Sequence, residues 1–310
     1  MPAPLVNAPP FLRRGRRTGA IMGDVLLALV PVTAASLWYF QWKALWLLTV
    51  TVVSCCLAEF VCRKERDFDG SAAVTGVLLA LSLPSGTPLW AAAVAGFFAI
   101  AVVKELFGGI GRNLLNPAMA GRALLMTVWP QTVSGYELPD AVSSATPLSQ
   151  IGEVDWWSLL CGSTNGSMGE TSALLILLGG AYLYLRGMIR LRAPLTCLGV
   201  FAAVIWVFGG DVPFTGNAAA HLLSGGLMLA AFFMVTDYTT KPVTPWGEVL
   251  FAAGVGALTA VLRLWGPYPE GACFAILMMN LLSPLLEHIT RRRVYGVRVP
   301  LSRHRMETEA

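Results

Sequence analysis

Charged side chains are scarce in this sequence. Only 13% of its 310 residues are Asp, Glu, Lys or Arg and 55% are hydrophobic, whereas a water-soluble domain carries about 25% charged residues. The mean hydropathy is +0.64. A membrane-spanning helix needs about 20 mostly apolar residues, and a membrane β-barrel would show short alternating segments instead. We therefore expect an all-α polytopic integral membrane protein embedded in a lipid bilayer.

The net charge of +4 does not indicate a nucleic-acid partner. Basic residues concentrate at the chain ends and in short loops, where the positive-inside rule places them. The first basic cluster, residues 13–17, precedes an apolar run over 19–40. That run lacks an A-x-A-like exit, so we expect a retained first helix and not a cleaved signal peptide.

Signatures of several enzyme classes are missing as well. The six cysteines form no C-x-x-C pair and the three histidines are widely scattered, so no metal site is predicted. Neither a hydrolytic triad nor a Walker loop can be recognised. Most of the cysteines lie in apolar runs, where we expect them to pack as small hydrophobic side chains.

Ten apolar runs are predicted to be membrane spans. They cover residues 19–40, 44–62, 72–84, 89–107, 112–129, 171–186, 194–209, 217–235, 247–264 and 271–289. Basic residues follow the second, sixth and tenth runs and bracket the loop after the fourth. All of these basic residues lie on one side of the membrane if both termini are cytoplasmic.

One long stretch of the chain has no basic residue at all. Lys and Arg are absent between Arg122 and Arg186, although five acidic residues occur there. We therefore predict that residues 130–170 form an external loop. This loop contains the hydroxyl-rich run "DAVSSATPLSQI" at 140–151. Long loops without structure of their own are usually functional or disordered.

The two halves of the chain share a weak internal similarity. The segment "SAAVTGVLLALSLP" at 71–84 resembles "LLSGGLMLAAFFM" at 222–234, and the charge map gives the two segments opposite directions. Two inverted repeats are an architecture that many transporters use to build a midplane site. The predicted organisation is a single membrane domain over 1–310. Residues 1–129 hold the first five spans, 130–170 the external loop, 171–290 the last five spans and 291–310 a cytoplasmic tail.

The fifth predicted span is interrupted. Three glycines at 108–111 loosen the backbone, and the Asn116-Pro117 step disfavours continuous helix. A helix broken at membrane depth lines a cavity or is buried in protein, and its new N-terminus offers free N–H groups to an anion or a polarised carbonyl. Asn113 and Asn116 add donors and acceptors suited to a heteroaromatic ring. The alternative is a glycine-rich surface for helix packing.

Four further polar residues are candidates for contacts with a ligand or ion. Arg122, near the middle of span five, would face a partner or bound anion, or snorkel to the external surface. Asp237 at the end of span eight and Glu105 are acidic groups near span ends and hence ion-contact candidates, although Asp237 could simply be solvated in a loop. Thr171, at the start of span six, would cap the helix or contact a ligand.

These residue patterns leave three functions open. An interrupted span and inverted halves suit a small-solute channel or transporter, a membrane redox subunit fits equally well, and a structural scaffold is the third alternative. All three have the same hydropathy profile.

Three stretches distinguish these alternatives by resemblance. "FGGIGRNLLNPAMAGRALL", "VSSATPLS" and "GGLMLAAFFMVTDYTTKPVTPWG" occur in this order. Together they resemble the D subunit of the Rnf/Rsx ion-translocating electron transport complex, in the family that includes the B subunit of the sodium-pumping NADH:quinone reductase. That family's fold is thought to be similar to that of urea channels, so a urea-channel-like transporter is the alternative function.

The resemblance implies a covalent flavin. In the family, the threonine of an S-[GS]-A-T motif forms a phosphoester with FMN, and this motif places the bond on Thr146. Its small neighbours Ser143 and Ser144 would give access to the nucleotide and to a separate flavin transferase, which acts after export. Serine stands at 144, where glycine is common. A plain Ser/Thr turn before a proline is the alternative interpretation of this motif.

A second flavin site is also implied by the resemblance. The "GRNLLNPA" segment would face the FMN ring or a second, non-covalent flavin such as riboflavin, with Arg112, Asn113 and Asn116 as contacts. Arg122 and Thr171 are further candidates for cofactor binding. FMN passes electrons one or two at a time, and the protein supplies position and electrostatics.

The resemblance also implies the assembly. The chain would be one component of a complex in the bacterial inner membrane that links ferredoxin and NAD to Na⁺ or H⁺ movement. Its partners would be the A, B, C, E and G subunits of the Rnf/Rsx complex and the flavin transferase. The chain alone would not be active.

The predicted topology can be tested by cysteine labelling. An impermeant maleimide added to intact cells should modify a cysteine placed within 130–170 and leave one placed before residue 18 unmodified until the cells are opened. Equal labelling of the two positions in intact cells would contradict the external placement of the loop.

Overall fold

The computed structural model describes residues 18–63, 69–133, 166–170, 172–210, 212–266 and 270–291. Every regular element in these ranges is helical, and the single β-type pairing among them is an isolated bridge between Pro84 and Ser167. Three of the helices are long and apolar enough to cross a membrane: α1 (Thr18–Cys62), α10 (Pro245–Trp265) and α11 (Ala272–Thr290). The predicted all-helical class is therefore confirmed for the described ranges, whereas the ten spans and the inverted repeats stay predictions.

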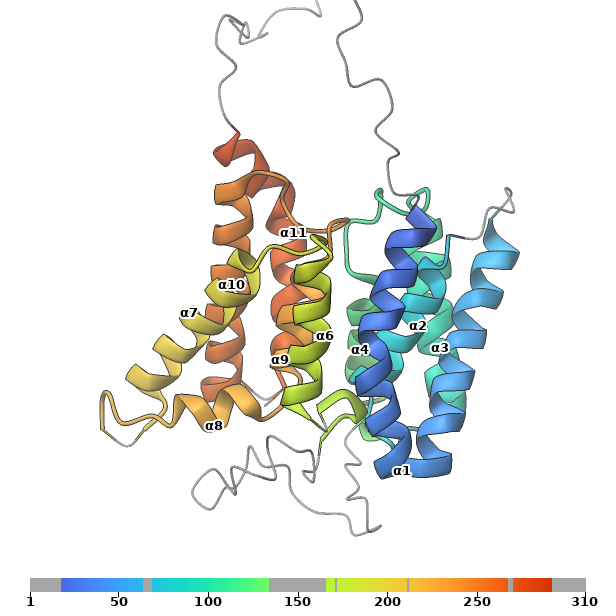
Figure 1. Cartoon of the computed structure of the whole chain (residues 1–310), viewed down its shortest axis with the longest axis horizontal. Coiled ribbons are helices and arrows are strands. Elements are labelled where there is room, and N and C mark those ends of the chain that lie inside the picture. The colour runs from blue at the N-terminus through green and yellow to red at the C-terminus, as the bar shows by residue number, and fades with distance from the viewer. Residues whose placement is uncertain are drawn as a thin grey trace, which may run out of the picture.

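The first half of the chain begins with a folded-back helix. Within α1, Gln41 has a non-helical backbone (φ 47°, ψ −124°), and the chain reverses into two antiparallel limbs (Figure 1). After α1 come α2 (Ser71–Ser82), α3 (Leu89–Phe98), the π-helical η1 (Ala99–Glu105), α4 (Pro117–Val128) and the short 3-10 turn η2 (Pro130–Thr132).

The second half packs against the first through α6 on α1 and α11 on α4. Its elements are η5 (Met168–Glu170), α6 (Ala173–Leu185), α7 (Arg192–Phe208), α8 (Ala218–Leu223), α9 (Leu227–Leu229), the π-helical η6 (Ala230–Met234), α10 and α11.

Two of the predicted spans are broken. The run predicted at 112–129 becomes helical only at Pro117, as the Asn116-Pro117 step indicates. The run predicted as one span over 217–235 is interrupted between α8 and α9 at Ser224, Gly225 and Gly226, where Gly225 has a φ of 80°. The sequence prediction did not include this interruption.

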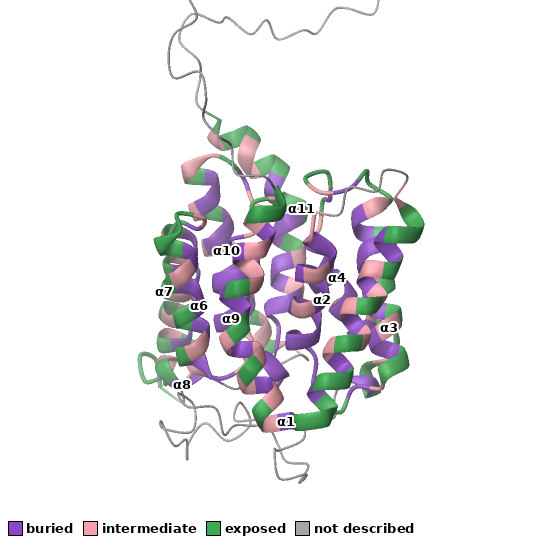
Figure 2. Cartoon of the chain, turned by 45° about the vertical axis from the view of Figure 1, so that its right-hand side comes forward, coloured by how far each residue is buried: buried purple, intermediate pink, exposed green. Residues whose placement is uncertain are grey.

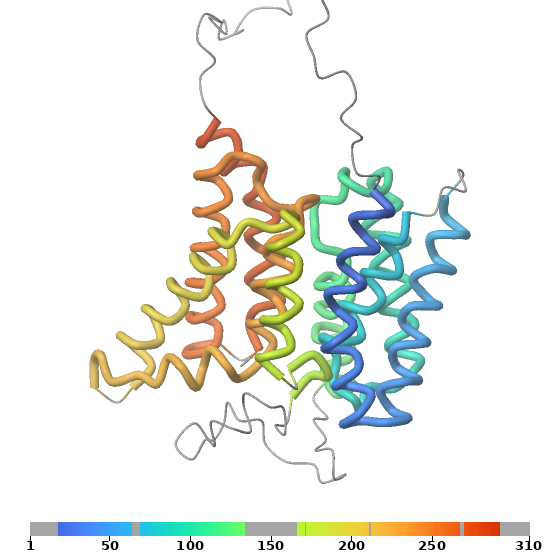
Figure 3. Tube along the Cα trace, viewed as in Figure 1, coloured from blue at the N-terminus to red at the C-terminus, as the bar shows by residue number. Residues whose placement is uncertain are grey.

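The bundle has two distinguishable ends. The start of α1 and the end of α11 lie at one end, whereas the end of α4 and the start of α6 lie toward the other (Figures 1 and 3). Buried residues occupy the centre of the bundle and exposed ones its periphery (Figure 2). The periphery carries large apolar side chains such as Trp38, 81% exposed, and Leu185, 82% exposed. An apolar surface of this extent suits contact with lipid.

Close helix packing makes Gly179 in α6 sensitive to substitution. A Cβ atom there would lie 2.3 Å from the carbonyl oxygen of Ala28 in α1, whereas a Cβ at Gly199 in α7 meets nothing within 4 Å. We expect Gly179→Ala to destabilise the purified protein by about 1–3 kcal/mol through overpacking, and Gly199→Ala to leave its stability unchanged or raised. Thermal melting in detergent measures both, and equal melting temperatures would contradict this packing.

Candidate functional site

A cavity of about 110 Å³ lies between the two halves, at the end of the bundle where α1 begins. Its walls are mostly apolar, with a few polar side chains. They come from the first limb of α1, α2, η1, the 106–116 loop, α4, the segment from α6 to 189, and η6 with the chain that follows it. The polar residues lining it are Ser71, Thr75, Lys104, Asn113, Asn116, Thr236, Asp237, Tyr238 and Thr239.

Local sequence explains the loop that enters this cavity. Gly108, Gly109 and Gly111 have φ values of 103°, 89° and 83°, a region that glycine adopts without steric cost. Helix α4 then starts at Pro117, and the Asn116 side chain accepts a hydrogen bond from the Met119 amide at 3.3 Å. Asparagine at the N-cap and proline at the first position are a favourable helix start.

The two asparagines meet the chain that follows η6. Asn116 Nδ2 donates to Asp237 Oδ2 at 3.4 Å, and Asn113 Nδ2 donates to Thr239 Oγ1 at 3.4 Å and to the Leu115 carbonyl at 3.1 Å. Asp237 Oδ1 also accepts from the Thr239 amide at 3.0 Å and its hydroxyl at 2.8 Å. The structure thus brings three of the predicted site residues, Asn113, Asn116 and Asp237, to one cavity.

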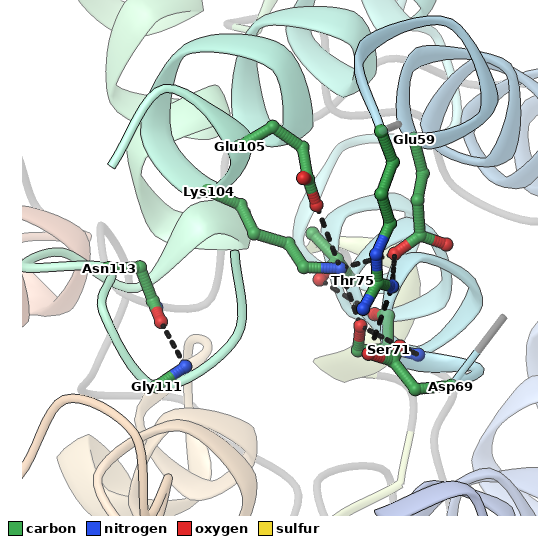
Figure 4. Close-up of polar contacts among 9 residues, drawn as sticks. Glu59, Asp69, Ser71, Thr75, Lys104, Glu105, Gly111 and Asn113 are labelled. Carbon is green, nitrogen blue, oxygen red and sulfur yellow. Dashed lines mark hydrogen bonds and ion pairs between the residues drawn. The ribbon is translucent and has the colours of Figure 1, made fainter. Parts of the chain in front are cut away.

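A buried ion pair lies beside the cavity. Lys104 Nζ is 2.5 Å from Glu59 Oε1 and donates to Ser71 Oγ at 2.6 Å. Figure 4 shows Lys104 reaching toward Glu59 and Ser71, with Glu105 next to it. Sequence reasoning missed Lys104 and Glu59, although each is a charged residue inside a predicted apolar run, which is costly unless it has a partner.

Asp69 and Arg63 extend this network toward the helix ends. Asp69 Oδ1 accepts from the Ser71 amide at 3.0 Å and hydroxyl at 2.5 Å, and Asp69 Oδ2 lies 3.2 Å from Arg63 Nη1. Burial favours a higher pKa for Asp69, but the Ser71 hydrogen bonds and the charges of Lys104 and Arg63 outweigh it and lower the pKa below its usual value. Asp69 therefore stays ionised and orients Ser71.

Two other predicted residues lie near the cavity but do not line it. Glu105 Oε1 is 3.6 Å from Lys104 Nζ. Arg112 is exposed on the 106–116 loop, where its side chain packs over Gly108. Contacts of these two residues with a ligand stay predictions.

Arg122 belongs to a separate cluster near the opposite end of the bundle. Its Nη2 pairs with Glu270 Oε2, which joins α4 to the start of α11, and both side chains are buried. Nearby, Ser167 donates to Glu170 Oε1 at 2.5 Å. A cavity of about 20 Å³ is lined by Arg122, Ser167 and Glu270 of this cluster. Arg122 therefore faces a partner inside the protein, as one of the sequence interpretations expected, and does not snorkel to the external surface.

Arg263 of α10 completes the same cluster. Its Nη1 donates to the carbonyls of His221 at 2.5 Å and Ser224 at 3.2 Å. These carbonyls belong to the C-terminal end of α8, where the helix is interrupted and its last carbonyls have no intrahelical partner. Arg263 therefore stabilises the break that the sequence prediction missed.

Ser143, Ser144, Thr146 and Thr171 lie outside the described residues. Within the ranges that are described, no three His, Cys, Asp or Glu side chains gather closely enough to hold a metal ion.

Comparison with known proteins gives matches over nearly the whole chain. Residues 5–296 match the NQR2, RnfD, RnfE family. The chain is 41% identical over 309 residues to the D subunit of the Na(+)-translocating ferredoxin:NAD(+) oxidoreductase complex of Acetobacterium woodii, covering 94% of this chain and 95% of that protein. It is 37% identical to the D subunit of the proton-translocating ferredoxin:NAD(+) oxidoreductase complex of Clostridium ljungdahlii (94% and 96% covered). It is 33% identical to the D subunit of the ion-translocating oxidoreductase complex of Escherichia coli O1:K1 (94% and 98% covered).

The Arg122–Glu270 pair can be tested by a double-mutant cycle. Because removing one member of a buried pair deprives the other charge of its closest partner, we expect Arg122→Gln or Glu270→Gln alone to destabilise the protein, by up to about 3–5 kcal/mol. The double substitution should cost less than the sum of the two single ones. Thermal melting in detergent measures the cycle, and strictly additive effects would show that the two side chains are not coupled.

Proposed function

The chain belongs to the NQR2, RnfD, RnfE family, and we propose that it is the D subunit of a membrane complex that couples electron transfer between ferredoxin and NAD to the translocation of Na⁺ or H⁺. The match over 94% of the chain to relatives named as this component carries the proposal. The A, B, C, E and G subunits of such a complex would be its partners. The inner membrane of a bacterium would be its location.

Covalent attachment of FMN to Thr146 is the more specific part of the proposal. The run "SSAT" at 143–146 supplies a threonine hydroxyl beside small neighbours. A phosphoester at that hydroxyl would attach the nucleotide through its phosphate and leave the flavin ring chemically unchanged. When bound, FMN accepts and releases electrons singly or in pairs. The role of the chain is to hold the nucleotide at one end of the bundle.

The arrangement of the helix ends supports an external position for this segment. The end of α4 and the start of α6, which flank it in the sequence, lie toward the end of the bundle opposite the start of α1 and the end of α11. With the termini cytoplasmic, Thr146 would be exposed to a flavin transferase outside the membrane. The basic residues that precede α1 and follow α11 in the sequence agree with the positive-inside rule.

The cavity at the other end is the proposed site of a second, non-covalent flavin. Its side walls are mostly apolar, and its polar side chains include Asn113, Asn116 and Lys104, donors and acceptors that fit the edge of a heteroaromatic ring. Its volume of about 110 Å³ is below the ~300–1,000 Å³ of most small-molecule sites. Apolar side chains of the wall must therefore move apart when a tricyclic ring enters.

Ion contact is proposed for two acidic residues near this cavity. Asp237 shares the cavity wall with the Thr239 hydroxyl, and carboxylate and hydroxyl oxygens suit hard cations. Glu105 lies beside Lys104 at the end of η1. A cation held at either position would lie close to the proposed second flavin.

A solute channel is the less favoured function. Interrupted helices such as α4 and α8–α9 also occur in transporters. However, the relatives that match most of this chain are named as oxidoreductase subunits, and the residues of the cavity include a buried lysine and an aspartate that an uncharged solute does not need.

The flavin attachment is tested by denaturing electrophoresis with in-gel fluorescence and by mass spectrometry. The protein purified from cells that contain the transferase should fluoresce, and the peptide that contains Thr146 should carry the mass of FMN. Thr146→Ala should remove both signals completely. Ser144→Gly, which introduces the residue common in the family, should keep them and serves as the matched control. A fluorescent Thr146→Ala protein would refute the assignment.

A further inference from the structure

Two charged side chains occur among the described residues that line the larger cavity, Lys104 and Asp237. They come from different halves of the chain, Lys104 from η1 and Asp237 from the segment after η6. Asp237 is held by Asn116 and Thr239, and Lys104 by Glu59 and Ser71. A ring in this cavity would therefore meet a cation and an anion held by separate sets of partners.

The Lys104 ammonium retains a donor. It has three N–H groups, and two of them are directed to Glu59 Oε1 at 2.5 Å and Ser71 Oγ at 2.6 Å. Glu105 Oε1 lies 3.6 Å from Nζ and forms an ion pair with it, but this distance is beyond a hydrogen bond. The third N–H therefore makes no short hydrogen bond to Glu105 and can turn to a ligand in the cavity that Lys104 lines.

The surroundings hold this ammonium in place. Lys104 is 2% exposed and lies on the seven-residue π-helical turn η1, an irregularity that is frequent at functional sites. Ser71, its hydroxyl partner, stands at the start of α2 and is oriented by Asp69 (Figure 4). Because its partners are fixed, Lys104 presents its charge to the cavity in one position.

We propose that Lys104 positions the second flavin and raises its affinity for electrons, by donating a hydrogen bond to the carbonyl edge of the ring, where negative charge accumulates on reduction. The inference rests on the proposed function, because it requires a flavin in this cavity. Asp237 would accept from the ring N–H that lies between the two carbonyls while Lys104 donates to one of those carbonyls, so the two charges select one orientation. Charge near the ring and hydrogen bonds to it are the means by which proteins tune flavins, and burial strengthens them.

The charge balance of the pair makes the proposal testable. Glu59 compensates Lys104, so Glu59→Gln leaves the ammonium in place with less compensation and should raise the midpoint potential of the second flavin. The double variant Glu59→Gln with Lys104→Gln removes the ammonium together with the carboxylate closest to it. It should lower the reduction equilibrium constant about tenfold, which corresponds to about 59 mV for a one-electron couple or about 30 mV for a two-electron couple.

The measurement is a spectroscopic redox titration of the assembled complex, together with extraction of non-covalent flavin by acid denaturation. The covalent fluorescence at Thr146 reports on folding and assembly in each variant. Opposite potential shifts in the single and double variants, or loss of extractable flavin from the double variant alone, support the role of Lys104. Identical potentials and full flavin content in both variants would overturn it.

A complex without any extractable flavin would overturn more than the role of Lys104. If the unmodified complex releases no flavin on denaturation while its covalent fluorescence is intact, the cavity holds no second flavin. That result removes both the second site and the role of Lys104, and leaves Thr146 untouched. Retained flavin with unchanged potentials removes only the role of Lys104.

Discussion

The solvent imposes the main constraint on this chain, because hydrocarbon offers no hydrogen bonds to a backbone group that lacks a partner. Where a helix stops inside the bundle, protein side chains must replace the missing bonds. Asn116 accepts from the Met119 amide where α4 begins, and Arg263 donates to the His221 and Ser224 carbonyls where α8 ends. The two breaks are therefore the places where polar side chains enter the apolar bundle.

Each break is accompanied by a buried pair of charges. Lys104 and Glu59 lie near the cavity of the 106–116 loop, and Arg122 and Glu270 lie near the interruption between α8 and α9. Burying two charges costs as much as their attraction returns, so such pairs contribute little net stability. Their contribution is positional, because they join segments that are distant in the sequence.

Particular residues show how far sequence reasoning reaches. The start of α4 was predictable because Asn116-Pro117 is a local signal for a helix start. The same segment contains Asn113 and Asn116, which were predicted as site residues and which line the larger cavity. The interruption at Ser224–Gly226 was missed, since a Gly-Gly pair in an apolar run is also typical of close helix packing. Lys104 and Glu59 were missed because their pairing joins positions 45 residues apart. A hydropathy profile shows each of them only as a single charged residue within an apolar run.

The sequence by itself determined the helical class, the positions of most helices and the family, because the length of apolar runs and short local motifs depend only on neighbouring residues. Tertiary structure alone decided which polar groups share a cavity. Asn116 meets Asp237, and Arg122 meets Glu270, across 121 and 148 positions of the chain. These partners are selected by how the helices pack in three dimensions, and no local pattern of side chains encodes that packing.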